Sequence, residues 1–98
     1  MDWGKVAKGL LAISHWPWHV VPLIDEPVIK DADGYVIASM PGLDEDATFI
    51  AAAPWLLAEA LLERVNLEVM TVALPMEIHL KTLGISPEDY TEIKRRLA

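Results

Sequence analysis

The stretch FIAAAPWLLAEALLE, Phe49 to Glu63, combines strong helix formers with a proline near its centre. Proline has no backbone N–H to donate, and its ring clashes with the carbonyl group four residues earlier, here that of Ile50. We therefore predict either one helix that bends at Pro54 or a second helix that begins with Pro54 in its first turn.

The helix is expected to span residues 44–66. Asp44 is a suitable N-cap, and the acids that follow it favour the positive end of the helix dipole. Its predicted buried ridge consists of Ile50, Leu57, Leu61 and Val65, with Phe49 and Leu56 beside it. Helical spacing places Trp55 elsewhere, on the polar face with Glu59 and Glu63.

The clearest local signal is PVIKDADGYVIASM. Two β-rich runs, 28–30 and 35–39, flank Asp-Ala-Asp-Gly. The Asp31 carboxylate can start a turn, and Gly34 can supply the left-handed residue that closes it with a bulge. A β-hairpin is predicted over residues 28–39, and a further strand near residues 18–21.

Helical patterns occupy both ends of the chain. Residues 2–13 predict a short amphipathic helix with Trp3, Val6, Leu10 and Ile13 on one stripe. Residues 75–83 predict a short helix that Gly84 stops. Ser86 and Pro87 then start the last helix, whose predicted buried stripe is Tyr90, Ile93 and Leu97. Residues 67–74 fit either a continued helix or a strand.

Together these signals predict one small α+β domain over residues 1–98. Segment 1–14 is the N-terminal helix, 15–66 the hairpin and helix core, and 67–98 a C-terminal helical hairpin. A small antiparallel sheet, formed by the 28–39 hairpin and the strand near 18–21, should pack against the proline-bent helix 44–66. Short N- and C-terminal helices complete the predicted fold.

Composition narrows the classes of function. The net charge of -7 disfavours binding to nucleic acids or anionic membranes, because Lys and Arg drive phosphate binding. The absence of cysteine excludes disulfides and thiolate chemistry. The longest apolar run falls well short of the roughly 20 residues that a membrane helix needs, and the N-terminus has no signal-peptide pattern. We expect a cytoplasmic protein. Its apolar content of 53% favours self-association or a partner surface.

Three segments carry a resemblance to a known group of proteins. PWHV at 17–20, DADGYVIA at 31–38 and DATFIAAAPWLL at 46–57 occur in this order. They resemble small tailed-phage and prophage proteins of unknown function, which typically read PGPW, then a D-x-x-G hairpin, then N-A-x-L-I-A-A-A-P-(D/E)-L-L. The resemblance covers about residues 15–62. It implies a phage or prophage accessory protein with a small α+β fold and no established activity.

The chain departs from that pattern at three positions. Asp46 stands where the group usually has Asn, Trp16 replaces the Gly before Pro17, and Trp55 replaces the usual acidic residue after the proline. The N-terminal helix and the segment beyond residue 66 lie outside the shared pattern. We expect any specialised function to lie in those segments.

No pattern of residues predicts catalysis or metal binding. His15 and His19 are four residues apart, but Pro17 lies between them, and the only other histidine is His79. A closed tetrahedral site is therefore not expected. The chain has neither a G-x-S-x-G motif nor a phosphate loop, and Ser14 beside His15 is not a patterned nucleophile–base pair. We predict a non-enzyme without catalytic, cofactor or metal residues.

Contact with another protein remains the leading hypothesis. Tryptophan is favoured at binding hot spots, and the acidic stretch 25–46 could dock on a basic groove or form an ordinary solvated surface. The predicted partner-binding residues are Trp55, Glu59, Glu63, Asp25, Glu26, Asp31 and Asp33. The predicted partner is a host or anti-phage defence protein in the host cytosol, with homo-oligomer formation also expected.

Two alternatives stay open from the sequence. The C-terminal helices could belong to a small nucleic-acid-associated regulator, although Glu88 and Asp89 at the start of the candidate recognition helix would repel phosphates. The chain could also be a structural, homo-oligomeric phage component.

Overall fold

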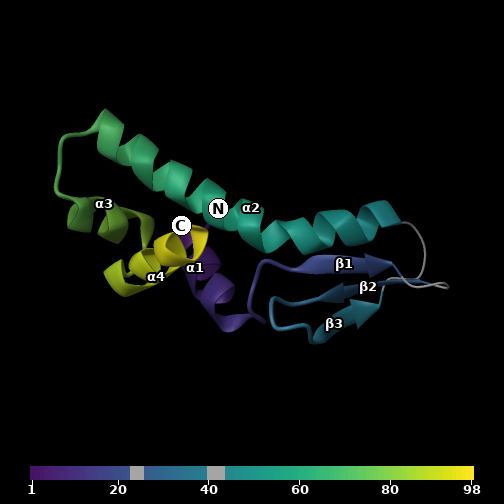
Figure 1. Cartoon of the computed structure of the whole chain (residues 1–98). Coiled ribbons are helices and arrows are strands. Elements are labelled where there is room, and N and C mark those ends of the chain that lie inside the picture. Colours follow the sequence, from purple (N-terminus) through teal and green to yellow (C-terminus); the bar gives the residue numbers. More distant parts are fainter. Residues whose placement is uncertain (23–25, 40–43) are drawn as a thin grey trace. The chain divides into compact units, whose positions relative to one another are not determined.

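The computed structural model describes residues 1–22, 26–39 and 44–98. Its elements are α1 (Trp3–Ala12), β1 (His19–Pro22), β2 (Pro27–Lys30), β3 (Val36–Ser39), α2 (Asp44–Thr71), α3 (Met76–Leu83) and α4 (Pro87–Leu97) (Figure 1). The strands form one antiparallel sheet in the order β1-β2-β3. The predicted α+β fold with short terminal helices is confirmed.

The chain forms two compact units, and α2 contributes to both. One unit contains residues Ser14–Leu56, with the sheet and the first part of α2. The other contains Met1–Ile13 and Leu57–Ala98, with the rest of α2 and the three short helices.

The predicted hairpin is present, and its turn has the expected chemistry. Asp31 Oδ1 accepts hydrogen bonds from the backbone N–H groups of Asp33 (3.0 Å) and Tyr35 (2.9 Å). Gly34 has the positive φ of 88° that the closing residue requires. The register shifts from the pair Ile29–Ala38 to the pair Lys30–Val36, so β3 carries the bulge. The strand expected near 18–21 is β1.

Helix α2 runs without interruption through Pro54 and on to Thr71. Of the two predicted alternatives, a second helix that starts at Pro54 is therefore wrong. The predicted end near residue 66 is also too early, and residues 67–71 are helix, not strand. The capping role predicted for Asp44 falls on a side chain outside the described part of the structure.

The buried line of α2 differs from the predicted ridge. Its buried residues are Ala47, Ala51, Pro54, Ala58, Leu61 and Val65. The prediction is correct for Leu61 and Val65 but wrong for Ile50 and Leu57, which are exposed. In the Ser14–Leu56 unit, Ala47 and Ala51 pack against Ile29 of the sheet, with Trp18, Val20 and Ile37 around them. Alanine lets the sheet approach the helix backbone closely, and this decides which face turns inward.

Helix α1 also buries two small residues, Gly4 and Ala7. Gly4, Ala7 and Leu10 are buried, so of the predicted stripe only Leu10 lies fully inside, and Ile13 is exposed. A Cβ atom on Gly4 would collide with the carbonyl oxygen of Gly84 and lie 3.1 Å from its carbonyl carbon. The backbones at Gly4 and Gly84 therefore lie so close that no larger side chain could fit between them. This contact determines which face of α1 is buried.

The C-terminal helices begin and end as predicted. Gly84 follows α3 in the left-handed conformation, with φ 77°. The Ser86 hydroxyl caps α4 by accepting the N–H of Asp89 at 3.1 Å. Tyr90 and Ile93 are buried, while Leu97 is half-buried.

Replacing Gly4 with alanine should destabilise the protein by about 1–3 kcal/mol, the usual cost of an overpacked contact. Gly9 provides a matched control on the same helix, because a Cβ atom there meets nothing within 4 Å. Gly9→Ala should stabilise the protein by up to about 1 kcal/mol through its higher helix propensity. Urea unfolding of the two variants measures both changes, and equal effects would contradict the close contact between Gly4 and Gly84.

Candidate functional site

The acidic hairpin divides its carboxylates between structural and exposed positions. Asp31 is only 6% exposed, and its carboxylate is occupied by the turn N–H groups. Asp33 is exposed and its Oδ2 lies 2.9 Å from Nδ1 of His15. Because Asp31 faces its own backbone, it can hold the turn but offers little surface to a partner.

The neighbouring predicted acids lie in different settings. Glu26 is half-buried, and its carboxylate accepts a hydrogen bond from the Ser39 hydroxyl at 3.1 Å. Asp25 lies outside the described residues. The structure therefore brings Asp31 and Asp33 together in one turn, and places Glu26 at the other end of the hairpin beside Ser39.

Trp55 has an aromatic partner within its own unit. Its ring meets that of Trp16 edge to face, with 6.1 Å between ring centroids and an interplanar angle of 84°. Trp16 is 5% exposed, while Trp55 is half-buried. Both tryptophans are departures from the phage-protein pattern, and here they contact each other. A partner-binding role for Trp55 stays a prediction, but the helical count alone could not reveal this contact.

Glu59 and Glu63 are both exposed on the later part of α2, in the other compact unit. Arg64, which follows Glu63, forms an ion pair with Glu68 one turn further on, with 2.7 Å between Nη2 and Oε1. The surface on this part of the helix is thus charged and solvated. Such i,i+4 pairs contribute only about 0.3–0.5 kcal/mol.

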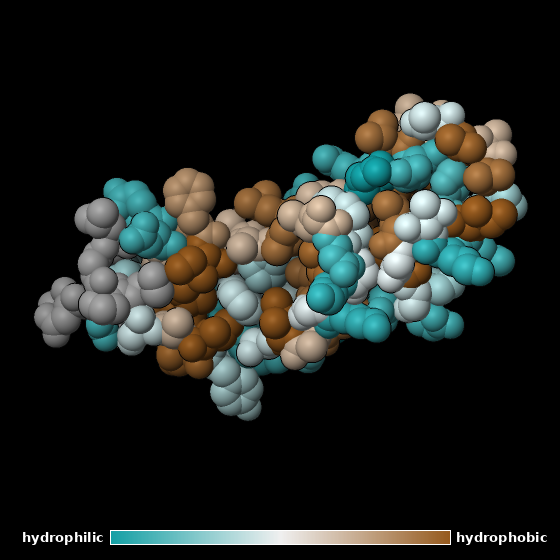
Figure 2. Space-filling model, turned by 180° about the vertical axis from the view of Figure 1, so that it is seen from behind, coloured by the Kyte–Doolittle hydropathy of each residue, from teal (hydrophilic) through white to brown (hydrophobic). Residues whose placement is uncertain are grey.

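Many exposed apolar side chains of this unit lie where α2 ends. We define the exposed apolar segment as residues 67–78, which cover the last turn of α2, the loop and the first residues of α3. Seven large apolar side chains in it are exposed: Leu67, Val69, Met70, Val72, Leu74, Met76 and Ile78. Figure 2 shows hydrophobic atoms interspersed with hydrophilic ones where α2 runs into this loop. Such a surface is typical of an interaction site.

The sequence analysis did not identify this segment as a contact surface. Its signal is nevertheless present, because LEVMTVALPMEI contains seven large apolar residues and only two charged ones. The apolar residues follow neither a clean helical period nor a clean alternation, so the pattern indicated an ambiguous element instead of an exposed one.

Hydrogen bonds from His79 and Leu74 hold the loop of this segment in place. His79 is 3% exposed, and its Nε2 lies 3.0 Å from the carbonyl oxygen of Val72. Because a carbonyl can only accept, this nitrogen donates. The N–H of Leu74 also donates to the Val72 carbonyl at 2.9 Å. His79 is therefore a buried histidine with a structural role at the loop.

The basic end of α4 is internally paired. Arg95 and Arg96 both donate to the carboxylate of Glu92, at 2.8 Å and 3.1 Å from their Nε atoms. The hydrogen bonds from Arg95, and then those from Arg96, lower the pKa of Glu92 to about 2. Lys94 Nζ lies 5.9 Å from the centroid of the Tyr90 ring. Two of the three basic side chains are thus engaged by a neighbouring acid.

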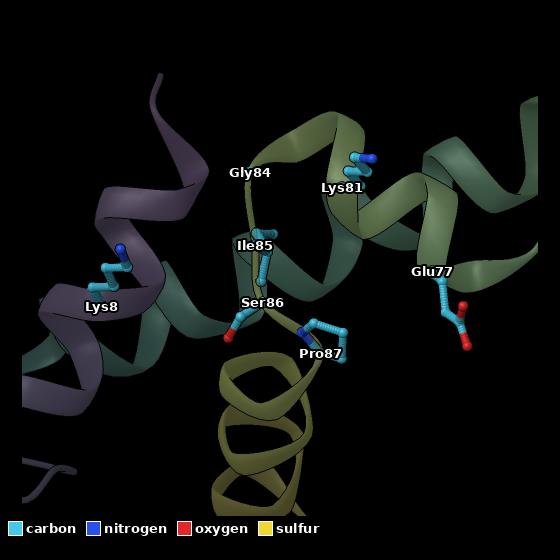
Figure 3. A pocket seen from close by; sticks show the side chains of 7 residues that line it. All are labelled: Lys8, Glu77, Lys81, Gly84, Ile85, Ser86 and Pro87. Atoms are coloured by element: carbon cyan, nitrogen blue, oxygen red, sulfur yellow. The ribbon is translucent and has the colours of Figure 1, made fainter.

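An open pocket of about 450 Å³ lies beside the turn between α3 and α4. Its lining residues are Lys8, Glu77, Lys81, Gly84, Ile85, Ser86 and Pro87. In Figure 3 the charged ends of Lys8, Glu77 and Lys81 point in different directions and do not converge on one ligand position. The pocket lacks the convergent polar groups that are typical of a small-molecule site.

Residues 1–22, 26–39 and 44–98, which the structure describes, contain no group of three or more His, Asp or Glu side chains that could hold a metal ion. None of the helices in the same part of the chain is both long and apolar enough to cross a membrane.

No protein-family model, curated protein or solved structure matches this chain. The contact surface is therefore argued from the geometry of the molecule, and the class of protein from the sequence resemblance alone.

Asp31→Ala should destabilise the hairpin by about 1–3 kcal/mol, because two turn N–H groups lose their acceptor. Asp31→Asn should cost less, since the amide oxygen can still accept. Asp33→Ala, at an exposed position in the same turn, should change stability by no more than about 0.5 kcal/mol. Thermal unfolding followed by circular dichroism compares the three. A larger loss for Asp33→Ala than for Asp31→Ala would contradict the assigned roles.

The Trp16–Trp55 contact should appear as a coupling energy in a double-mutant cycle. Replacing each tryptophan with leucine, singly and together, should give a coupling of about 0.5–1.5 kcal/mol beyond the loss of buried area. The cycle of Trp3→Leu with Trp55→Leu serves as the control, because Trp3 belongs to the other compact unit. The changes in unfolding free energy of these two single variants should add in the double variant. Additive effects for Trp16 and Trp55 would show that the ring contact contributes nothing specific.

Proposed function

We propose that this chain acts through protein–protein contact, not catalysis, and that the exposed apolar segment forms the contact. The observation that carries the proposal is the exposure of seven large apolar side chains within twelve consecutive residues. Met70, at 85% exposed, is the most accessible of them. Leaving such side chains in water is unfavourable, so their burial against a partner would supply binding energy.

The class of protein is proposed from the sequence resemblance. Residues 15–62 resemble small phage and prophage proteins, and we propose that this chain is an accessory protein of that kind. The exposed apolar segment lies beyond the shared pattern, where a specialised role was expected. A host or anti-phage defence factor in the cytoplasm fits such a role as the partner.

Charge supports this proposal over the nucleic-acid alternative. The net charge is -7, and Arg95 and Arg96 at the end of α4 already bind the carboxylate of Glu92. Glu88 and Asp89 occupy the first turn of that helix, which is the end that would face DNA bases. Phosphate binding would have to displace an existing ion pair and overcome this repulsion.

The test is site-specific photo-crosslinking in bacterial cells that express the protein. A photoreactive phenylalanine analogue at position 70 should form covalent adducts with protein, either a second copy or another chain. The same analogue at Glu59 or Asp33 provides the controls, because these exposed positions belong to the surfaces that the sequence predicted. Adducts at 59 or 33 and none at 70 would show that the contact lies on those surfaces and not on the exposed apolar segment.

A further inference from the structure

Within the Ser14–Leu56 unit, helix α2 has a second apolar face. Phe49, Ala53 and Leu56 recur at steps of four and three residues, so they lie on one side of the helix. Each follows a buried residue of the same helix by two positions, a rotation of about 200° that places it on the opposite side. Phe49 is 76% exposed and Leu56 is 57% exposed. The helix therefore buries small residues against the sheet and leaves large apolar ones facing solvent.

We define the outer face of α2 as this line together with Ile50 and Ala52, which flank it. Ile50 is 42% exposed, and Ala52 and Ala53 are half-buried. The two alanines lie between Phe49 and Leu56 along the helix, so a second backbone can come close between two large side chains. Packed helices use this arrangement, because the large side chains of one insert where the other has small ones. The spacing i, i+4, i+7 is also the one with which an amphipathic helix binds. The outer face thus fits another α-helix.

The charge of this unit indicates which kind of helix fits. Glu45 and Asp46 are exposed in the first turn of α2, and they neighbour Phe49 on the helix surface because they precede it by four and three residues. Residues 14–56 contain seven acidic residues against one lysine, so this unit carries -6 of the net charge of -7. A helix with Lys or Arg beside its apolar stripe is attracted to such a surface, whereas a second copy brings the same charge and is repelled.

The size of the outer face indicates the strength of the contact. Its three large side chains expose on the order of 100 Å² each, or roughly 300 Å², within the ~300–600 Å² of the largest and often functional apolar patch on a typical monomer. One partner in a standard protein complex buries roughly 800 Å². The outer face therefore suits a reversible contact with a dissociation constant on the order of 10 μM.

From these observations we infer that the outer face of α2 binds a basic amphipathic helix of another protein. The apolar side chains of that helix pack around Phe49 and Leu56, and its Lys or Arg side chains face Glu45 and Asp46. This surface belongs to the Ser14–Leu56 unit and does not include the exposed apolar segment. The inference therefore goes beyond the proposed function and does not depend on it.

Isothermal titration calorimetry of the full chain with a synthetic peptide tests the inference. The peptide has about three heptads, with leucine at positions a and d and lysine at positions e and g. A control peptide has the same composition in scrambled order and so lacks the apolar stripe. The first peptide should bind with a dissociation constant on the order of 10 μM, and the scrambled peptide at least about tenfold more weakly.

Phe49→Ala should weaken binding of the first peptide about tenfold or more, because it removes the most exposed anchor without changing the charge. Leu56→Ala provides a second variant if Phe49→Ala alters the circular dichroism spectrum. Tyr35→Ala is the matched control, since Tyr35 is an aromatic residue of the same unit that is 72% exposed on the hairpin. It should leave the dissociation constant within about twofold of the wild-type value.

The acidic residues have their own variant. Replacing Glu45 with Gln and Asp46 with Asn should weaken binding about threefold or more and reduce its dependence on salt concentration, because the lysines of the peptide lose their partners. Binding that this double variant leaves unchanged would contradict the basic character inferred for the partner.

Several outcomes would overturn the inference. Absence of binding is one, and equal binding of the scrambled peptide is another. Binding that Phe49→Ala and Leu56→Ala both leave within about twofold would show attraction to charge alone. A dimer in analytical ultracentrifugation that Phe49→Ala dissociates would show that a second copy covers the outer face.

Met70→Ala separates this surface from the exposed apolar segment. Met70 belongs to the other compact unit, so its replacement should leave peptide binding within about twofold of the wild-type value. Peptide binding that is lost with Met70→Ala and kept with Phe49→Ala would overturn the inference and leave the proposed function standing.

Discussion

The packing of Ile29 against Ala47 and Ala51 determines which side of α2 faces inward. The buried positions continue along the helix in steps of four and three residues, through Pro54 and Ala58 to Leu61 and Val65. These steps keep one stripe on one side of a regular helix. In each compact unit, the buried residues of α2 belong to this stripe. Phe49, Ile50 and Leu56, which lie off the stripe, are consequently left exposed.

Pro54 illustrates how such a constraint overrides a local preference. A proline inside a helix costs about 3 kcal/mol through the missing hydrogen bond and the steric clash. In this chain Pro54 is itself buried on the stripe, between Ala51 and Ala58. Its ring therefore adds packing contacts where the backbone loses a hydrogen bond, and the helix continues to Thr71. A sequence pattern shows the local cost of the proline but does not show the packing that offsets it.

The difference between local preference and long-range packing also explains how much of the fold could be predicted from the sequence. The Asp31–Gly34 turn, the stop at Gly84 and the Ser86 cap were predicted correctly, because each depends on residues within a few positions of one another. The buried faces of α1 and α2 were predicted incorrectly in part. Hydropathy favours large side chains as core residues, whereas close approach of distant backbone favoured Gly4, Ala47 and Ala51. The Trp16–Trp55 contact likewise joins positions that no local pattern links.

These packing errors bear directly on the candidate site. When small residues occupy the core, large apolar residues are left at the surface. The amino-acid composition does not show where on the surface these residues lie. Within residues 67–78, seven large apolar side chains are exposed, and Glu68 and Glu77 are the two charged residues, while the chain as a whole is strongly acidic. The net charge of -7 makes two copies of the chain repel each other from most directions of approach. Dissolved salt screens this repulsion less when the copies are closer than the Debye length. Burial of these apolar side chains against a partner is favourable without any ion pair. The net charge thus disfavours contact between acidic surfaces. The small residues in the core leave large apolar residues at the surface, where contact with a partner is favourable.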